Sequence, residues 1–134
     1  MFAKTQLISI SFSFPDVCKV ATPVGPVPIP FPNFAFSILA IPNVLNMFIT
    51  AMPVHNLMTN TPISTGNEPS ASGGGGVVSN QFIGSKRNLL GSFKIFKSCM
   101  PSTRMLDMSA QNGVADNMPG LNLSPSQVKV LEFS

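Results

Sequence analysis

A chain of 134 residues with 10% charged side chains, no tryptophan and no tyrosine, but 11 phenylalanines and 13 prolines, differs from an ordinary soluble domain, in which about a quarter of the residues are charged. The length allows one domain with a modest core. The net charge of +3 comes from scattered residues rather than a dense basic stripe, so we expect no nucleic-acid partner. With 44% hydrophobic residues, the chain is predicted either to have part of its surface covered by a partner or to present a surface of Ser, Thr, Asn and Gln.

The N-terminal stretch, residues 1–15, is not typical of a signal peptide, because serines interrupt its apolar residues and no small-residue cleavage site follows. Residues 36–52 are strongly apolar, but Pro42, Asn43 and Asn46 interrupt them and the stretch is short for a membrane span of about 20 residues. We therefore expect a protein made in the cytoplasm without a signal peptide or membrane anchor.

Apolar residues and serines alternate between residues 6 and 14. Ile8, Ile10, Phe12 and Phe14 share one face, and the serines share the other. This period of two predicts a half-buried strand whose apolar face packs inward, and Pro15 is expected to end it.

Prolines dominate the next stretch, residues 14–33, where from Pro23 to Pro32 they recur at almost every second position. Proline fixes φ and lacks an amide hydrogen, which excludes a helix and a central strand here. We predict an extended rod of polyproline character that lies against the body of the protein, because the residues between the prolines are apolar. A linker, or a ligand for an aromatic groove, is the alternative.

The rest of the chain reads as short strands separated by turns, at residues 44–50, 54–57, 92–97 and 127–133, with a return of the chain over 103–108. Residues 59–79 are expected to be a loop. Its glycine run, Gly73–Gly76, is followed by no lysine at the spacing of a phosphate-binding loop. We interpret the run as a flexible loop or as a tight crossing where only glycine fits.

A weak internal repeat aligns residues 48–53, FITAMP, with residues 96–101, FKSCMP. Each copy is interpreted as a strand, a Met-Pro turn and a returning strand. The chain is therefore predicted to be all-β, a small wedge-like or layered body of short hairpins with long Pro- and Gly-rich loops.

Three soft side chains, Cys18, His55 and Cys99, are the candidates for chemistry. Each lies near a predicted strand end or turn, so folding could gather them around zinc or iron, with Asp16, Asp107, a water or a partner group as a further ligand. The alternative is that the cysteines are small packing residues and His55 is simply hydrogen-bonded. The few carboxylates show no spacing that suggests acid–base catalysis, so we do not expect an enzyme.

Five motifs together resemble the PAAR-like proteins over nearly the whole chain. They are F-P-D-V-C (residues 14–18), T-P-x-G-P-V-P-I-P-F-P-N (22–33), M-P-V-H-N-L (52–57), G-S-F-K-I (91–95) and L-S-P-S-Q-V-K-V-L (123–131). The resemblance implies a β-rich cone that forms the structural tip of a contractile injection apparatus such as the type VI secretion system. Such a tip caps a trimeric spike of the VgrG type, with one copy per trimer.

The same resemblance implies a structural metal at the apex, zinc or iron, held by His and Cys. Cys18 and His55 stand in matching motifs, whereas Cys99 is added on its chemistry alone. The sequence departs from better-known members, because residues 52–55 and 100–104 replace their Pro-Ala-Ala-Arg repeats and because it contains one histidine.

We accordingly expect residues 1–134 to form a single spike-tip domain without a toxin extension. The resemblance also implies that the injection machine secretes the protein, that effector proteins attach to it, and that it touches the target membrane transiently. A small hydrolase or toxin that uses Cys18 or Cys99 with His55 is the alternative function.

Overall fold

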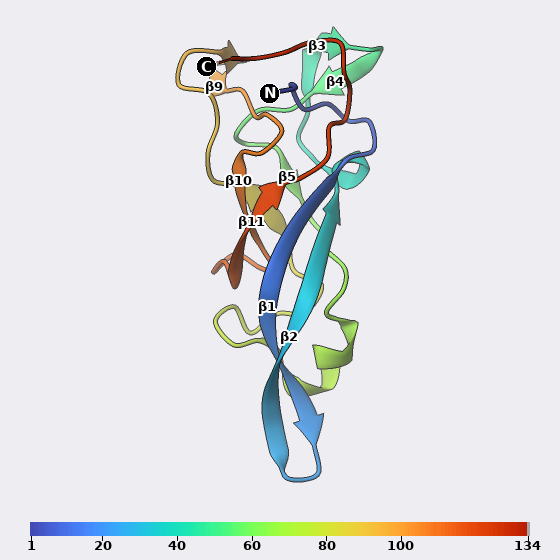
Figure 1. Cartoon of the computed structure of the whole chain (residues 1–134), viewed down its shortest axis with the longest axis vertical. Coiled ribbons are helices and arrows are strands. Elements are labelled where there is room, and N and C mark those ends of the chain that lie inside the picture. Colours follow the sequence, from blue (N-terminus) through green and yellow to red (C-terminus); the bar gives the residue numbers. More distant parts are fainter. Residues whose placement is uncertain (134) are drawn as a thin grey trace.

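The computed structural model describes residues 1–133 and shows an elongated all-β molecule that is broad at one end and narrows to a single hairpin at the other (Figure 1). A seven-stranded antiparallel sheet runs along it in the order β2-β1-β11-β10-β7-β5, with β6 also paired to β1. Two separate two-stranded sheets, β3–β4 and β8–β9, lie at the broad end (Figure 1). The all-β prediction is confirmed.

The elements of the large sheet are β1 (Ile10–Thr22), β2 (Gly25–Phe36), β5 (Asn60–Thr61), β6 (Gly75–Gly76), β7 (Lys86–Asn88), β10 (Met108–Gln111) and β11 (Met118–Asn122). The small sheets and the 3₁₀ helices are β3 (Val44–Ile49), β4 (Met52–Val54), β8 (Phe96–Lys97), β9 (Met100–Pro101), η1 (Ser37–Leu39) and η2 (Glu68–Gly73). Of these helical segments in residues 1–133, none has the length and apolar character needed to span a membrane.

The proline-rich stretch forms the long β1–β2 hairpin, which corrects the prediction of a polyproline rod. Strand β2 is an edge strand, as the exclusion of a central strand required. Pro26, Pro28 and Pro30 pair with Ala21, Lys19 and Val17, so they occupy alternating positions of β2. In an antiparallel edge strand, every second residue directs its backbone nitrogen away from the partner. The proline spacing therefore leaves the hairpin intact while removing the N–H groups that a further strand would need.

Pro15 does not end the first strand, as predicted, but forms a bulge within it. The pairing shifts from Ser13–Asn33 to Asp16–Phe31, so that Phe14 and Pro15 together oppose one residue of β2. An extra residue reverses which side chains face inward. Asp16 and Cys18 are consequently both fully buried.

The first strand also buries the face opposite to the one that the sequence predicts. Ser9, Ser11 and Ser13 are buried, whereas Ile8 and Phe14 are exposed. The buried apolar residues of the described chain are all small: Ala3, Cys18, Ala35, Ala40, Val44, Val54 and Ala110. The interior is otherwise made of Ser, Thr, Asn, Gln and a few charged residues. A molecule this narrow has little room for a large apolar core, so its interior combines small apolar side chains with polar ones.

Glycine allows other segments to pack tightly around the β1–β2 hairpin. We call this hairpin, together with residues 64–85 and 112–117 that pack on it, the shaft. A Cβ added at Gly73 would lie 2.1 Å from the backbone oxygen of Lys19, and one added at Gly66 would lie 2.1 Å from that of Pro32. Of the two interpretations of the glycine run, the tight crossing is thus confirmed.

Replacing Gly73 with Ala is expected to lower the free energy of unfolding by at least about 2 kcal/mol, because the atom that obstructs the new methyl group is rigid backbone. Urea denaturation would measure the loss. The matched control is Ser72→Ala, at the exposed neighbouring position, which should change stability by no more than about 0.5 kcal/mol. Equal stability of Gly73→Ala and the wild type would contradict the close crossing.

Candidate docking surface

The two predicted hairpins at the broad end have the same register. In the first, Ile49 pairs with Met52 and Phe48 with Pro53. In the second, Lys97 pairs with Met100 and Phe96 with Pro101. The internal repeat is therefore confirmed.

In each hairpin, the turn is formed by the two residues that directly precede the Met-Pro pair. Thr50 and Ala51 have φ angles of 52° and 62°, and Ser98 and Cys99 have φ angles of 53° and 63°. Two successive residues with positive φ form the type I′ turn that suits a tight hairpin. Met and Pro begin the returning strand, which corrects the prediction that they form the turn.

A third arm with the same pairing is made from the two ends of the described chain. Phe2 pairs with Leu131, and the backbone N–H of Glu132 donates to the oxygen of Met1 at 2.7 Å. Leu131 thus stands opposite Phe2 as Phe48 stands opposite Pro53. Both ends lie beside the two hairpins at the broad end (Figure 1).

In each arm one segment lies on the outside and the segment paired with it lies on the inside. The three inner segments are joined into a ring by one backbone hydrogen bond that occurs three times. The donor and acceptor pairs are Gln6 N–H to Pro53 O at 2.9 Å, Leu57 N–H to Pro101 O at 2.9 Å, and Met105 N–H to Phe2 O at 2.8 Å. One chain therefore builds an end with approximate three-fold symmetry.

The outer segments of the arms, residues 44–48, 92–96 and 127–131, share one pattern of burial. Each begins with a buried residue, and its second and fifth residues are exposed apolar side chains. We call these six side chains the docking residues: Leu45, Phe48, Phe93, Phe96, Val128 and Leu131. Their exposed fractions range from 48% for Leu131 to 85% for Phe93. Single exposed apolar residues are common, but a set repeated on three arms indicates a binding surface.

Two of the outer segments are also held in the same way. The Ser92 hydroxyl accepts hydrogen bonds from the backbone N–H groups of Lys94 and Ile95, at 3.3 and 3.0 Å. The Gln127 side-chain oxygen accepts from the equivalent Lys129 and Val130, at 2.7 and 2.8 Å. Buried polar groups thus fix the chain where it presents apolar side chains outward.

The family model of the Toxin PAAR-like domain matches residues 9–120. This chain belongs to the Toxin PAAR-like family. Neither a curated protein nor a solved structure matches it. The resemblance inferred from the motifs is therefore confirmed, and the family match covers the shaft and two of the three arms of this PAAR-like chain.

The three predicted metal ligands of the PAAR-like chain do not come together. Cys18 is buried in the shaft, Cys99 is exposed in the turn between β8 and β9, and His55 lies inside the ring at the broad end. Within residues 1–133, no three side chains of His, Cys, Asp or Glu are grouped so that they could hold a metal ion. The expectation that folding gathers Cys18, His55 and Cys99 is wrong.

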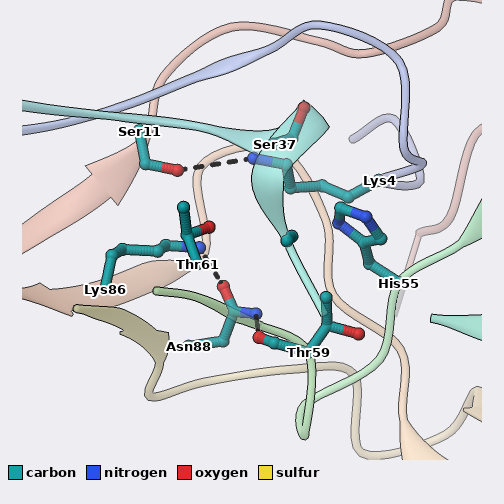
Figure 2. Close-up of a pocket in the computed structure, with 9 residues that line it drawn as sticks. Lys4, Ser11, Ser37, His55, Thr59, Thr61, Lys86 and Asn88 are labelled. Carbon is teal, nitrogen blue, oxygen red and sulfur yellow. Dashed lines mark hydrogen bonds between the residues drawn. The ribbon is translucent and has the colours of Figure 1, made fainter. Parts of the chain in front are cut away.

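His55 is enclosed by cations rather than by ligands. It lines a small polar pocket with Lys4 and Lys86 (Figure 2). Its Nε2 lies 2.8 Å from the side-chain oxygen of Gln6. Burial and then the positive charges of Lys4, Lys86 and Lys97 lower the pKa of His55 to about 3. A metal cation at this position would lie beside the same lysine side chains, which disfavours it.

Cys18 has Asp16 beside it, but its surroundings do not fit a metal either. Its sulfur is contacted by the amide nitrogens of Asn67 and Asn112, at 3.7 and 3.5 Å. Burial, and next the Asp16 carboxylate, raise the pKa of the Cys18 thiol, and the two amide groups direct hydrogens rather than lone pairs at its sulfur. The packing interpretation of Cys18 and His55 agrees with these contacts, but Cys99 is exposed and does not fit it.

Proposed function

We propose that this PAAR-like protein is the structural tip of a contractile injection apparatus of the type VI kind, and that its broad end caps a trimeric VgrG-type spike. The observation that carries the proposal is the ring of three equivalent arms, each with exposed apolar residues at the same two positions. A single chain can meet three identical subunits equally only if it repeats its surface three times. The family match supports the association with such spikes at a coarser level.

The opposite end suits the puncture of a target envelope. The shaft narrows to the turn between β1 and β2, where Val24 is 99% exposed (Figure 1). In this proposal the tip touches the target membrane transiently, no residue has a catalytic role, and the machine itself delivers the protein, with effector proteins attached to tip or spike. The alternative hydrolase would need a cysteine beside His55, whose ring instead bonds to Gln6.

The stoichiometry of a complex tests the proposal. Light scattering of the protein mixed with a purified VgrG-type trimer should give a mass of one chain per trimer, even when the chain is in excess. Three chains per trimer, or a chain that stays free at micromolar concentrations of both proteins, would overturn the proposed capping role.

A further inference from the structure

One carboxylate in the shaft collects an unusual number of amide groups. Asp16 is fully buried, and its oxygens accept hydrogen bonds from the side-chain nitrogens of four asparagines. These are Asn33 at 2.9 Å, Asn67 at 3.0 Å, Asn112 at 3.3 Å, and Asn117. Their positions are widely separated in the sequence, so Asp16 connects β1 to β2, to the residue before η2, and to the loop between β10 and β11.

Three of these amides are held in one orientation by backbone donors. The oxygen of Asn67 accepts from the N–H of Ile83 at 3.0 Å, that of Asn112 from Gly84 at 3.2 Å, and that of Asn117 from Val78 at 2.9 Å. Rotating any of them by half a turn would place its NH₂ group against a backbone N–H and its oxygen against the carboxylate. Their hydrogens must therefore point at Asp16.

The N–H groups of these amides favour an anion between them rather than a cation. A metal ion beside Asp16 and Cys18 would face N–H hydrogens, whereas zinc and iron need lone pairs of nitrogen, oxygen or sulfur. Asn67 and Asn112 direct the same nitrogens at the Cys18 sulfur. The carboxylate is the charged acceptor to which these amides donate.

We infer that Asp16, held by the four asparagines, ties the shaft together in the place of a metal ion. Hydrogen bonds to an ionised acceptor are roughly twice as strong as those between neutral groups. The shaft needs such a tie, because its close glycine crossings leave no volume for a large apolar core. Cys18 packs beside the tie and is no ligand. The inference stands or falls independently of spike binding.

The test begins with elemental analysis of the wild-type protein purified without chelators, and with its thermal unfolding before and after treatment with EDTA. We expect much less than one zinc or iron ion per chain and the same unfolding midpoint with and without EDTA. About one ion per chain, lost in Cys18→Ala or with a large drop in the midpoint after EDTA, would overturn the inference.

Substitution of Asn67 with Asp separates the two arrangements further. The new carboxylate can still accept from Ile83, but it loses the donor to Asp16 and repels it. We expect the unfolding midpoint to fall by roughly 10 °C or more, without recovery when zinc is added. A metal site would gain a ligand, so an unchanged midpoint, or one that zinc raises, would contradict the inference. Should the variant not fold, the metal content of the wild type still decides.

Asp16→Asn is the complementary variant, since it keeps the shape of the side chain and removes its charge. It is also expected to lower the midpoint by roughly 10 °C or more. The matched control is Glu68→Gln, because Glu68 is an exposed carboxylate of the same region that accepts from the N–H of Gly66. A midpoint for Asp16→Asn equal to that of the control would refute the role of the carboxylate.

Discussion

Replacing Phe48, Phe96 and Leu131 together with Ser is expected to abolish measurable binding to a VgrG-type trimer. These three residues occupy the same position of the three arms and are 60%, 57% and 48% exposed. Apolar residues at the centre of an interface dominate its affinity, and each tenfold change in Kd corresponds to about 1.4 kcal/mol. We therefore expect each single replacement to weaken binding by roughly tenfold, and the triple replacement by roughly a thousandfold.

The three single replacements should also weaken binding to the same extent. Titration calorimetry on the three single variants should give Kd values within a few-fold of one another, because each arm meets an identical subunit. Val24→Ser is the matched control, since it removes an even more exposed apolar side chain at the opposite end and should leave Kd unchanged. A large loss confined to one arm, or a loss in the control, would contradict three-fold docking.

Much of the broad end could be predicted from the sequence. The FITAMP and FKSCMP repeat predicted two hairpins, and both form with the same register. The third arm gave a weaker signal, because its two strands come from opposite ends of the sequence and no turn joins them. Only the pairing of Phe2 with Leu131 in space reveals that it is equivalent to the others.

The interior of the shaft could not be predicted, because the usual rule of hydrophobic burial is reversed there. Alternation of serines with apolar residues between residues 6 and 14 correctly indicated a strand, but the prediction that its apolar face packs inward was wrong. Which face is buried depends on how much volume the neighbouring segments leave, which is a tertiary property. The same limitation hid the asparagines around Asp16, since each one resembles an ordinary loop residue in its own segment.

The predicted metal set failed for a related reason. The resemblance points to Cys18 and His55 as ligands that hold an apex together, whereas only the chemistry of its side chain points to Cys99. Spacing in the sequence could not show that His55 lies inside the broad end while Cys18 lies in the shaft. Pro15 held the clearest unused signal, because a proline within a long strand indicates a bulge, and this bulge turns Asp16 inward.

Replacing Lys4 with Met is expected to stabilise the fold at pH 7. Burial lowers the pKa of Lys4 to about 8, from 10.5 for the free side chain. Its ammonium donates to the Ser11 hydroxyl at 3.4 Å and to the Asn122 oxygen at 3.3 Å. These acceptors already bond to each other at 2.6 Å, so they keep a partner when the charge is removed. Because a shift of this size costs the charged form about 3 kcal/mol, we expect a gain of roughly 1–3 kcal/mol.

The same shift predicts an unusual dependence of stability on pH. Between pH 8 and 10.5 the unfolded chain keeps a proton on Lys4 that the folded protein has lost, so the free energy of unfolding rises with pH. The lowered pKa of the buried Lys86 also makes the free energy of unfolding rise with pH. The raised pKa of Cys18 has the opposite effect once the thiol of the unfolded chain ionises, near pH 9. Urea unfolding at pH 7.5 and 9.0 should therefore show that the wild type is more stable at the higher pH, by about 1 kcal/mol. The free energy of unfolding of Lys4→Met should depend less on pH. The matched control is Lys94→Met, at an exposed position, which should keep the slope of the wild type. Equal slopes in all three proteins would show that the Lys4 ammonium is not buried as the structure has it.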